Sequence, residues 1–416
     1  MRQVVVVGGG FAGCAAALTA RQAGMEVVLI EKMDQLSGLG PWTGQLLTWI
    51  ARQEVLLTGG GGAQILNLLD SLAIHRYYEM GVPGGSIVFD VTRLAEGMRH
   101  LLEEAGVKVR LRSRAIDVET RDRRVETIVL EDGSRIEGDA FVDATGQIST
   151  IEECEQYGQG CVLCMVQCPI FGSRISITAK AGVADEKRGS PSYMSCSLIA
   201  MESFSPDLRK KIEAEESGYF YLPVPQEFQD IDFTGQWPHP ERPVTRHLGK
   251  VIQIIHIPFA KTYANIPLNY LRRLPGFENA WLVNPLAGGT GQPLRMGAVA
   301  PRENSLRVKG FENLFVAGLK TGHIAGFVEV MFTADLAGYN ATRVALGKEP
   351  IVLSPKTLIG FFIAEIRDGM TPSDWPRDRK IDPKYHEQGL VSTDLNTIKE
   401  RIKEAGMMGI YQKPLS

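Results

Sequence analysis

The chain has 416 residues, which is too long for one ordinary hydrophobic core, so we expect two or more domains. Its 44% hydrophobic and 22% charged residues are typical of a soluble globular protein, and a net charge of −3 predicts no overall attraction to nucleic acid or anionic membranes. The first residues lack the layout of a signal peptide, and the apolar stretch 358–364 is too short to span a bilayer. We therefore expect a cytoplasmic protein.

The N-terminal residues predict a βαβ unit. Residues 3–7 form a run dominated by valine, as in a strand that is buried on both faces. The alanine-rich residues 11–23 predict a helix, and residues 25–30 predict a second strand. A strand, a helix and another strand in this order open a parallel α/β sheet.

A glycine loop joins the first strand to the helix. Gly8, Gly10 and Gly13 match G-x-G-x-x-G, in which the glycines permit a tight turn, close approach of a pyrophosphate and close packing of the helix on the strand. The N–H groups at the start of the helix then bind the phosphates. Glu31 ends the second strand, where an acidic residue binds ribose. The alternative is a glycine-rich turn without a ligand.

The α/β pattern continues after a helix at 90–104. Residues 108–136 predict three strands, and 140–142 lead into Asp143-Ala144-Thr145-Gly146. Later, 314–316 predict a strand and about 322–346 a helix. Between these parts, the sequence carries a cysteine cluster and a proline-rich stretch that do not fit the pattern.

Two features favour FAD over NAD as the dinucleotide. Many flavoproteins carry an Ala-Thr-Gly turn at the place of Ala144 to Gly146. Residues 313–318 resemble the strand that returns to the ribityl chain, although Leu319 follows where an acidic residue is common. The helix that begins at Gly322-His323-Ile324-Ala325-Gly326 would point its N-terminus at the isoalloxazine and stabilise reduced flavin.

The expected cofactor-binding residues lie in these loops. They are Gly8, Gly10, Phe11, Ala12, Gly13, Glu31, Lys32, Ala144, Thr145, Gly146, Gly318, Gly322, His323, Ile324, Ala325 and Gly326.

The expected fold class is α/β, with a Rossmann-type FAD-binding domain like that of glutathione reductase. This domain is discontinuous and consists of residues 1–146 and 275–350. Residues 147–274 form an inserted α+β domain for the substrate and the cysteine cluster, and residues 351–416 form a helical C-terminal appendix.

Several segments outside the glycine loop resemble the glucose-inhibited division protein A family, which includes the folate- and FAD-dependent tRNA uridine methyltransferases. The segments are 273–280, 314–318, 322–329, 338–341, 346–350 and 358–360. The resemblance implies a cytoplasmic flavoenzyme that binds FAD in an extended form. It covers the N-terminal unit and most of 270–365, but little of the middle.

Two departures from this family affect the expected reaction. The tRNA-modifying members carry a reactive cysteine in the loop after the second strand, whereas residues 33–50 contain no cysteine here. The long C-terminal tRNA-binding extension of the larger members is also missing from this sequence. These differences favour another reaction over methyl transfer to tRNA.

The cysteine cluster predicts a metal or redox centre. Cys161, Cys164 and Cys168-Pro169 reproduce the last three ligands of a ferredoxin-type C-x₂-C-x₂-C-x₃-C-P run. Cys154 is the nearest fourth ligand and Cys196 the reserve candidate. A [4Fe–4S] cluster beside a flavin is the first interpretation. Structural zinc, a redox-active thiol pair and inert buried cysteines are the alternatives.

Three further features of the sequence need an interpretation. His323 and Lys320 are the candidate catalytic residues, with a helix-capping histidine and a surface lysine as the alternatives. Gly59 to Gly62 form either a second anion-binding nest or, as we prefer, a flexible joint. Cys14 lies among alanines in the first helix, which indicates core packing.

The sequence therefore predicts an FAD-dependent oxidoreductase that acts on a small substrate and passes electrons between flavin and a [4Fe–4S] cluster. A tRNA-modifying enzyme that uses FAD and folate is one alternative, and an electron-transfer flavoprotein subunit is the other. The expected partner is a small-molecule substrate or a redox partner protein. A homodimer is compatible with the sequence, and membrane association is not expected.

Overall fold

The computed structural model describes residues 2–38, 40, 45–46, 51–76, 87–146, 175–188, 197–214, 219–223, 251–255, 259–262, 272–284, 297–322, 327–367, 385 and 387–415. The chain divides into two compact units. Unit 1 consists of Met1–Thr150, Ser173–Ser190 and Met296–Ser416, and unit 2 of Ile151–Gly172 and Pro191–Arg295.

A five-stranded parallel sheet forms the centre of unit 1, in the order β18-β10-β1-β2-β6. Its strands are β1 (Gln3–Val7), β2 (Glu26–Ile30), β6 (Lys108–Arg110), β10 (Ala140–Asp143) and β18 (Leu314–Val316). Val4 to Val6 and all of β18 are buried, as expected for strands that are covered on both faces. The predicted α/β class with a Rossmann-type parallel sheet is confirmed.

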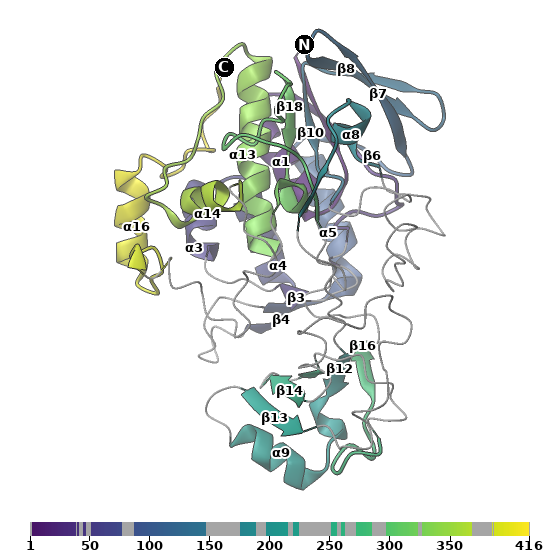
Figure 1. Ribbon diagram of the computed structural model, residues 1–416, viewed down its shortest axis with the longest axis vertical. Coiled ribbons are helices and arrows are strands. Elements are labelled where there is room, and N and C mark those ends of the chain that lie inside the picture. The colour runs from purple at the N-terminus through teal and green to yellow at the C-terminus, as the bar shows by residue number, and fades with distance from the viewer. Residues whose placement is uncertain are drawn as a thin grey trace. The chain divides into compact units, whose positions relative to one another are not determined.

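Helices cover one face of this sheet. Those in contact with its strands are α1 (Phe11–Gln22), α5 (Val91–Glu104) and α13 (Phe327–Ala345), and α4 (Gly61–Ser71) packs on α1 and α13. Helices α1 and α13 lie side by side (Figure 1). A Cβ atom on Gly338 would lie 2.2 Å from the carbonyl oxygen of Ala16, so glycine is needed for this close helix contact.

The other face of the sheet packs against a small antiparallel sheet. Its strands are β7 (Ala115–Arg121), β8 (Arg124–Leu130) and β9 (Arg135–Glu137). Val5 and Phe141 from the central sheet share a buried apolar cluster with Ile128 of β8 and Ile177 of the short helix α8 (Ile177–Lys180). The three strands predicted over 108–136 are thus four, because β6 leaves the hairpin and joins the parallel sheet.

Unit 1 also contains short strands between the elements that the sequence predicted. The short strands β3 (Gln45–Leu46), β4 (Ala73–Arg76) and β5 (Ile87–Phe89) form a sheet that the sequence did not predict. Strands β11 (Glu186–Arg188) and β17 (Gly297–Val299) pair antiparallel. Residues 173–190, which lie inside the expected insertion, make their contacts in unit 1.

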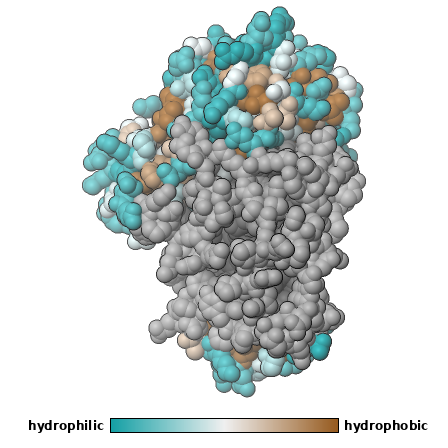
Figure 2. All heavy atoms as spheres, in the orientation of Figure 1, coloured by the Kyte–Doolittle hydropathy of each residue, from teal (hydrophilic) through white to brown (hydrophobic). Residues whose placement is uncertain are grey.

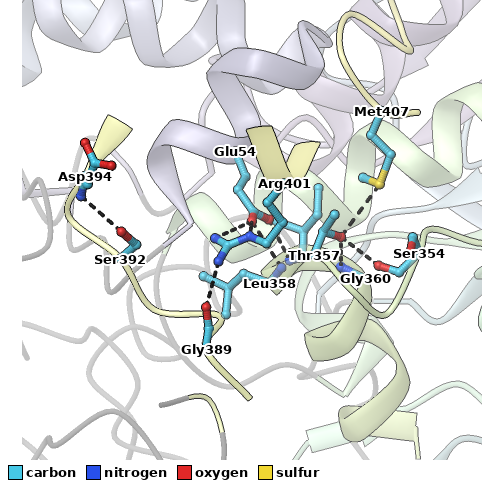
Figure 3. A network of polar contacts seen from close by, with 11 residues as sticks. Glu54, Ser354, Thr357, Leu358, Gly360, Gly389, Ser392, Asp394, Arg401 and Met407 are labelled. Carbon is cyan, nitrogen blue, oxygen red and sulfur yellow. Dashed lines mark hydrogen bonds and ion pairs between the residues drawn. The ribbon is translucent and has the colours of Figure 1, made fainter. Parts of the chain in front are cut away.

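The C-terminal residues also pack in unit 1. Helices α14 (Leu358–Arg367) and α16 (Leu395–Glu404) lie near α3 (Arg52–Thr58), where the buried carboxylate of Glu54 joins all three helices (Figure 3). Leu358 and Ile359 donate their N–H groups to Glu54 at 3.1 and 3.0 Å, and Arg401 donates at 2.9 Å. The expected helical appendix therefore shares the core of the first unit.

Unit 2 contains two small antiparallel sheets and a short helix. The strands are β12 (Ser197–Ala200), β13 (Tyr219–Pro223), β14 (Val251–Ile255), β15 (Phe259–Thr262) and β16 (Leu282–Asn284). After the 3₁₀ turn η2 (Met201–Ser203), Ser205 caps α9 (Pro206–Glu213) by accepting from the N–H of Leu208. Phe204 and Phe277 pack edge to face, with ring centroids 4.7 Å apart.

The visible part of the described surface is mainly hydrophilic, with apolar side chains in small groups (Figure 2). In the part of the chain that the structure describes, no helix is both long and apolar enough to cross a membrane.

Candidate functional site

The glycine loop makes a tight turn between β1 and α1. Gly8 has a φ of +106°, and its N–H donates to the carbonyl of Ile30 at 2.8 Å. A Cβ atom on Gly8 would lie 2.5 Å from the carbonyl oxygen of Ala144, and one on Gly13 would lie 1.7 Å from that of Gly8. The first and last glycines are thus required by backbone packing, as the motif predicts.

Gly10 differs from these two glycines because space remains beside it. Among the described residues, a Cβ atom there would meet only the Cα of Gly38 within 4 Å, at 3.9 Å. Gly10 is also the N-cap of α1, and no side chain caps this helix. Space beside the backbone and an uncapped helix N-terminus fit a dinucleotide pyrophosphate.

Glu31 fixes the shape of the loop from the end of β2. Its carboxylate is 7% exposed and accepts from the N–H of Gly9 at 2.5 Å and from that of Met33 at 2.8 Å. The carboxylate at the end of the second strand therefore holds the backbone on both sides of the turn. Lys32 follows at the surface of the same turn and is half-buried.

Phe11 and Ala12 pack against the other half of the site. The ring of Phe11 meets that of Phe327 edge to face, with centroids 5.0 Å apart. A Cβ atom on Gly318, whose φ is +68°, would lie 2.6 Å from the Cβ of Ala12. The turn after β18 therefore touches the glycine loop, although about three hundred residues separate them in sequence.

The Ala144-Thr145-Gly146 turn is held by the carboxylate before it. Asp143 is fully buried and accepts from the N–H and hydroxyl of Thr145, at 3.1 and 2.6 Å. It also accepts from the N–H and hydroxyl of Thr178, at 2.9 and 2.8 Å. No sequence motif pointed to Thr178, because only the folded chain brings it to this turn.

The return turn η3 (Gly318–Thr321) follows β18. Gly318 donates its N–H to the hydroxyl of Thr333 at 3.0 Å, and Gly322 has a φ of +98°. Lys320 is fully buried, and its ammonium donates to Ser176 at 2.6 Å and pairs with Asp185. This geometry differs from the surface lysine that we considered as the alternative.

Comparison with known proteins gives the family of this fold. Residues 3–149 match the family model described as FAD dependent oxidoreductase, and residues 261–349 match the model described as Glucose inhibited division protein A. Both matches identify parts of an FAD-dependent oxidoreductase, and the second resembles the glucose-inhibited division protein A family.

Relatives of this flavoprotein carry a more specific name. The methylenetetrahydrofolate–tRNA-(uracil-5-)-methyltransferase TrmFO of Caldicellulosiruptor bescii is 34% identical over 145 residues, which are 35% of this chain and only 31% of that protein. TrmFO of Geobacter sulfurreducens is 26% identical over 393 residues, covering 87% of this chain and 88% of its own. Aquifex aeolicus GidA shares the fold, with a TM-score of 0.63 at 17% identity over 97% of this chain and 76% of its own.

Several predicted residues of the flavoprotein cannot be placed. His323, Ile324, Ala325 and Gly326 lie outside the described residues. So do the expected metal ligands Cys154, Cys161, Cys164 and Cys168, and the reserve ligand Cys196. Over the described ranges, no group of three or more His, Cys, Asp or Glu side chains could hold a metal ion.

Cys14 is described and is buried. Its thiol donates to the carbonyl of Gly9 at 3.3 Å, and burial raises its pKa far above the ordinary value of a thiol. A protonated thiol within α1 is a poor nucleophile and metal ligand. The interpretation of Cys14 as core packing agrees with this position.

The glycines at 59–62 are not a second anion site. Gly62 donates its N–H to Asp335 at 2.8 Å, and Gly61 donates to the hydroxyl of Thr19, also at 2.8 Å. The N–H groups that an anion would need at the start of α4 are therefore taken by side chains of α13 and α1. The anion-binding alternative was wrong because Asp335 and Thr19, from two other helices, already accept from the N–H groups that would bind an anion.

Proposed function

We propose that this flavoprotein binds FAD with Gly8 to Gly13 and Glu31 against the adenosine diphosphate, and with the turns at Ala144 to Gly146 and Gly318 to Gly322 against the flavin half. The observation that carries the proposal is the open space beside Gly10 at the uncapped N-terminus of α1. When bound, FAD supplies two-electron transfer with an organic donor. The roles of Lys32, and of His323 to Gly326 at the flavin side, stay sequence-based proposals.

The proposed reaction is oxidation or reduction of a small molecule by the bound flavin. The residues of this chain would position the cofactor and exclude water. The missing cysteine in residues 33–50 supports this reaction over methyl transfer, because the chain lacks the nucleophile of the tRNA-modifying members there.

A tRNA-modifying function is the second candidate. It is favoured by relatives named as tRNA methyltransferases, one of which matches over 87% of this chain and 88% of its own length. In that case the protein would use methylenetetrahydrofolate and tRNA, and FAD would serve a one-carbon transfer.

One pair of assays separates the two candidates. The anaerobic, flavin-loaded protein is mixed with NADH, NADPH and a panel of small reductants, and flavin bleaching is followed. In parallel, methylenetetrahydrofolate with a labelled one-carbon unit is supplied with an unmodified tRNA transcript. Flavin turnover without label in tRNA supports the first candidate. Label in tRNA that depends on the flavin would replace it with the second.

The cysteine spacing supports a further proposal, that Cys154, Cys161, Cys164 and Cys168 hold a [4Fe–4S] cluster as electron partner of the flavin. Anaerobic purification should then give a brown protein with about four irons and labile sulfide per chain. A yellow protein that contains zinc, or no metal, would contradict the cluster.

A further inference from the structure

A buried ion pair joins the return turn to the segment 175–188, and the sequence indicated only its lysine. The lysine is Lys320 of η3, with 0% of its side chain exposed, and the carboxylate is Asp185, with 5% exposed. The hydroxyl of Ser176 accepts a second hydrogen bond from the ammonium, at 2.6 Å. One Asp185 oxygen, Oδ1, has no hydrogen-bond partner in the described structure, so the lysine is the main charge that compensates this carboxylate.

Asp185 reaches Lys320 through a segment that is itself firmly anchored. Residues 175–188 carry α8 and β11, and β11 pairs with β17 through Glu186 opposite Val299. Thr178 of this segment bonds to Asp143 at the end of β10. On the lysine side, the backbone carbonyl of Lys320 accepts from the N–H of Ala300 at 3.1 Å. Both charges are thus held on rigid backbone.

The pair lies near the carboxyl ends of the parallel strands, where the dinucleotide loop is also found. Lys320 is two residues after Gly318, whose Cα faces the Cβ of Ala12 in the glycine loop. Ligands of open α/β sheets bind outside the carboxyl ends of the strands, and η3 follows the carboxyl end of β18. Charges in such a buried place act over longer distances than surface charges, because water screens them little.

We propose that Asp185 and Lys320 form an electrostatic pair that sets the reduction potential of the flavin, with Asp185 offsetting the positive charge of Lys320. This inference rests on the proposed function, because it requires FAD at the carboxyl ends of the parallel strands. Uptake of two electrons and one proton adds one negative charge to the flavin. An uncompensated lysine ammonium favours that form, and an uncompensated carboxylate opposes it.

The two single substitutions should therefore shift the potential in opposite directions. Asp185→Asn keeps the size of the side chain but removes its charge, so the midpoint potential should rise. Lys320→Met should lower it. Because water screens buried charges little, the reduced-to-oxidised ratio at a fixed potential should change roughly tenfold in each case. The double variant should return close to the wild-type ratio.

The experiment is an anaerobic titration with dithionite and reference dyes at pH 8, on flavin-loaded wild type and the three variants. Glu312→Gln is the matched control, because it also removes a carboxylate paired with a basic residue, Arg124, but at an exposed position before β18. Its potential should equal that of the wild type. Flavin affinity and the melting temperature are measured beside each potential.

An unchanged potential in Asp185→Asn, or shifts of the same sign in both single variants, would overturn the inference. If Lys320→Met does not fold, Asp185→Asn and the double variant decide, since removing both charges leaves no unpaired buried charge. The two proposals fail in different ways. A folded wild type that binds no FAD contradicts the proposed function, whereas a wild type with FAD and insensitive variants contradicts only the ion pair.

Discussion

The N–H groups at the start of a helix need hydrogen-bond acceptors, and α1 differs from α4 and α14 in what can accept from them. In the loop, the glycines leave the start of α1 open. At α4 and α14, a buried carboxylate from a distant part of the chain occupies the N–H groups, Asp335 in the first case and Glu54 in the second. The first arrangement leaves room for a ligand, and the second closes the site with protein.

This difference predicts which substitutions affect flavin binding and which affect the stability of the fold. Asp335 joins α13 to α4, and Glu54 joins α3 to α14 and α16, so both carboxylates connect segments far apart in sequence. Glu54→Gln should therefore destabilise the fold, and Asp335→Asn should change how stability depends on pH, both without a direct effect on flavin. Substitutions in the glycine loop should act on the fold or on flavin according to which glycine is changed.

Gly13→Ala should have the largest effect. The added Cβ would lie 1.7 Å from the carbonyl oxygen of Gly8, so β1 and α1 must move apart. We expect a loss of about 3 kcal/mol or more in the free energy of unfolding, or no soluble protein. Urea unfolding followed by circular dichroism measures this. A variant as stable as the wild type would show that the helix does not pack on the strand as described.

Glu54→Gln should have the next largest effect. The change leaves the guanidinium of Arg401, 14% exposed, without its carboxylate, and weakens the bonds to the start of α14. Removing one partner of a buried pair typically costs about 3 kcal/mol. Limited proteolysis should also cut the C-terminal segment earlier than in the wild type.

The matched control for this change is Glu103→Gln in the exposed pair of Arg99 and Glu103. We expect a loss of about 0.5 kcal/mol or less there. Equal losses in both variants would show that Glu54 is no more important than a surface charge.

Asp335→Asn tests the other remote carboxylate through pH. Burial raises the pKa of Asp335 to about 7, from 3.8. The folded state therefore holds a proton that the unfolded state loses between about pH 4 and pH 7, so this group makes the wild type less stable as pH rises through that window. Asn does not titrate, so the free energy of unfolding of Asp335→Asn minus that of the wild type should rise by about 2 kcal/mol from pH 5 to pH 8.

Asp90→Asn is the comparison for Asp335→Asn, because Asp90 caps the helix that directly follows it in sequence. Asp90 caps α5 from the adjacent position, and its bonds to Thr92 lower the pKa of its carboxyl. The stability from this group is present above its unfolded pKa and lost as pH falls, so its pH slope has the opposite sign. Unfolding measured at several pH values checks both. Parallel slopes for the two variants would contradict the raised pKa of Asp335.

The sequence predicted those parts whose signals lie close together in the chain. The glycine spacing, the buried valine run of β1 and the position of Glu31 together indicated the dinucleotide loop, because each depends on local backbone geometry. The parallel sheet followed from the same residues. The strand pattern over 108–136 was also visible, although the pattern alone could not show that β6 joins the central sheet.

The polar contacts between distant segments could not be predicted in this way. Asp143 with Thr178, Asp185 with Lys320 and Asp335 with Thr19 pair residues that share no motif and no periodicity. Lys320 looked like either a surface or a catalytic lysine, because its neighbours in sequence do not reveal its burial. Such contacts depend on the packing of the whole unit, which one sequence does not display.

The most direct test of the account is the affinity of the apoprotein for FAD, measured for wild type and Gly10→Ala. The account predicts about one FAD per chain in the wild type, as the pyrophosphate approaches the backbone at Gly10. Because a Cβ at Gly10 meets no atom of the described residues nearer than 3.9 Å, the variant should keep the wild-type stability and lose at least about tenfold in affinity. A folded wild type that takes up no FAD, or a Gly10→Ala variant that binds it equally well, would contradict the site.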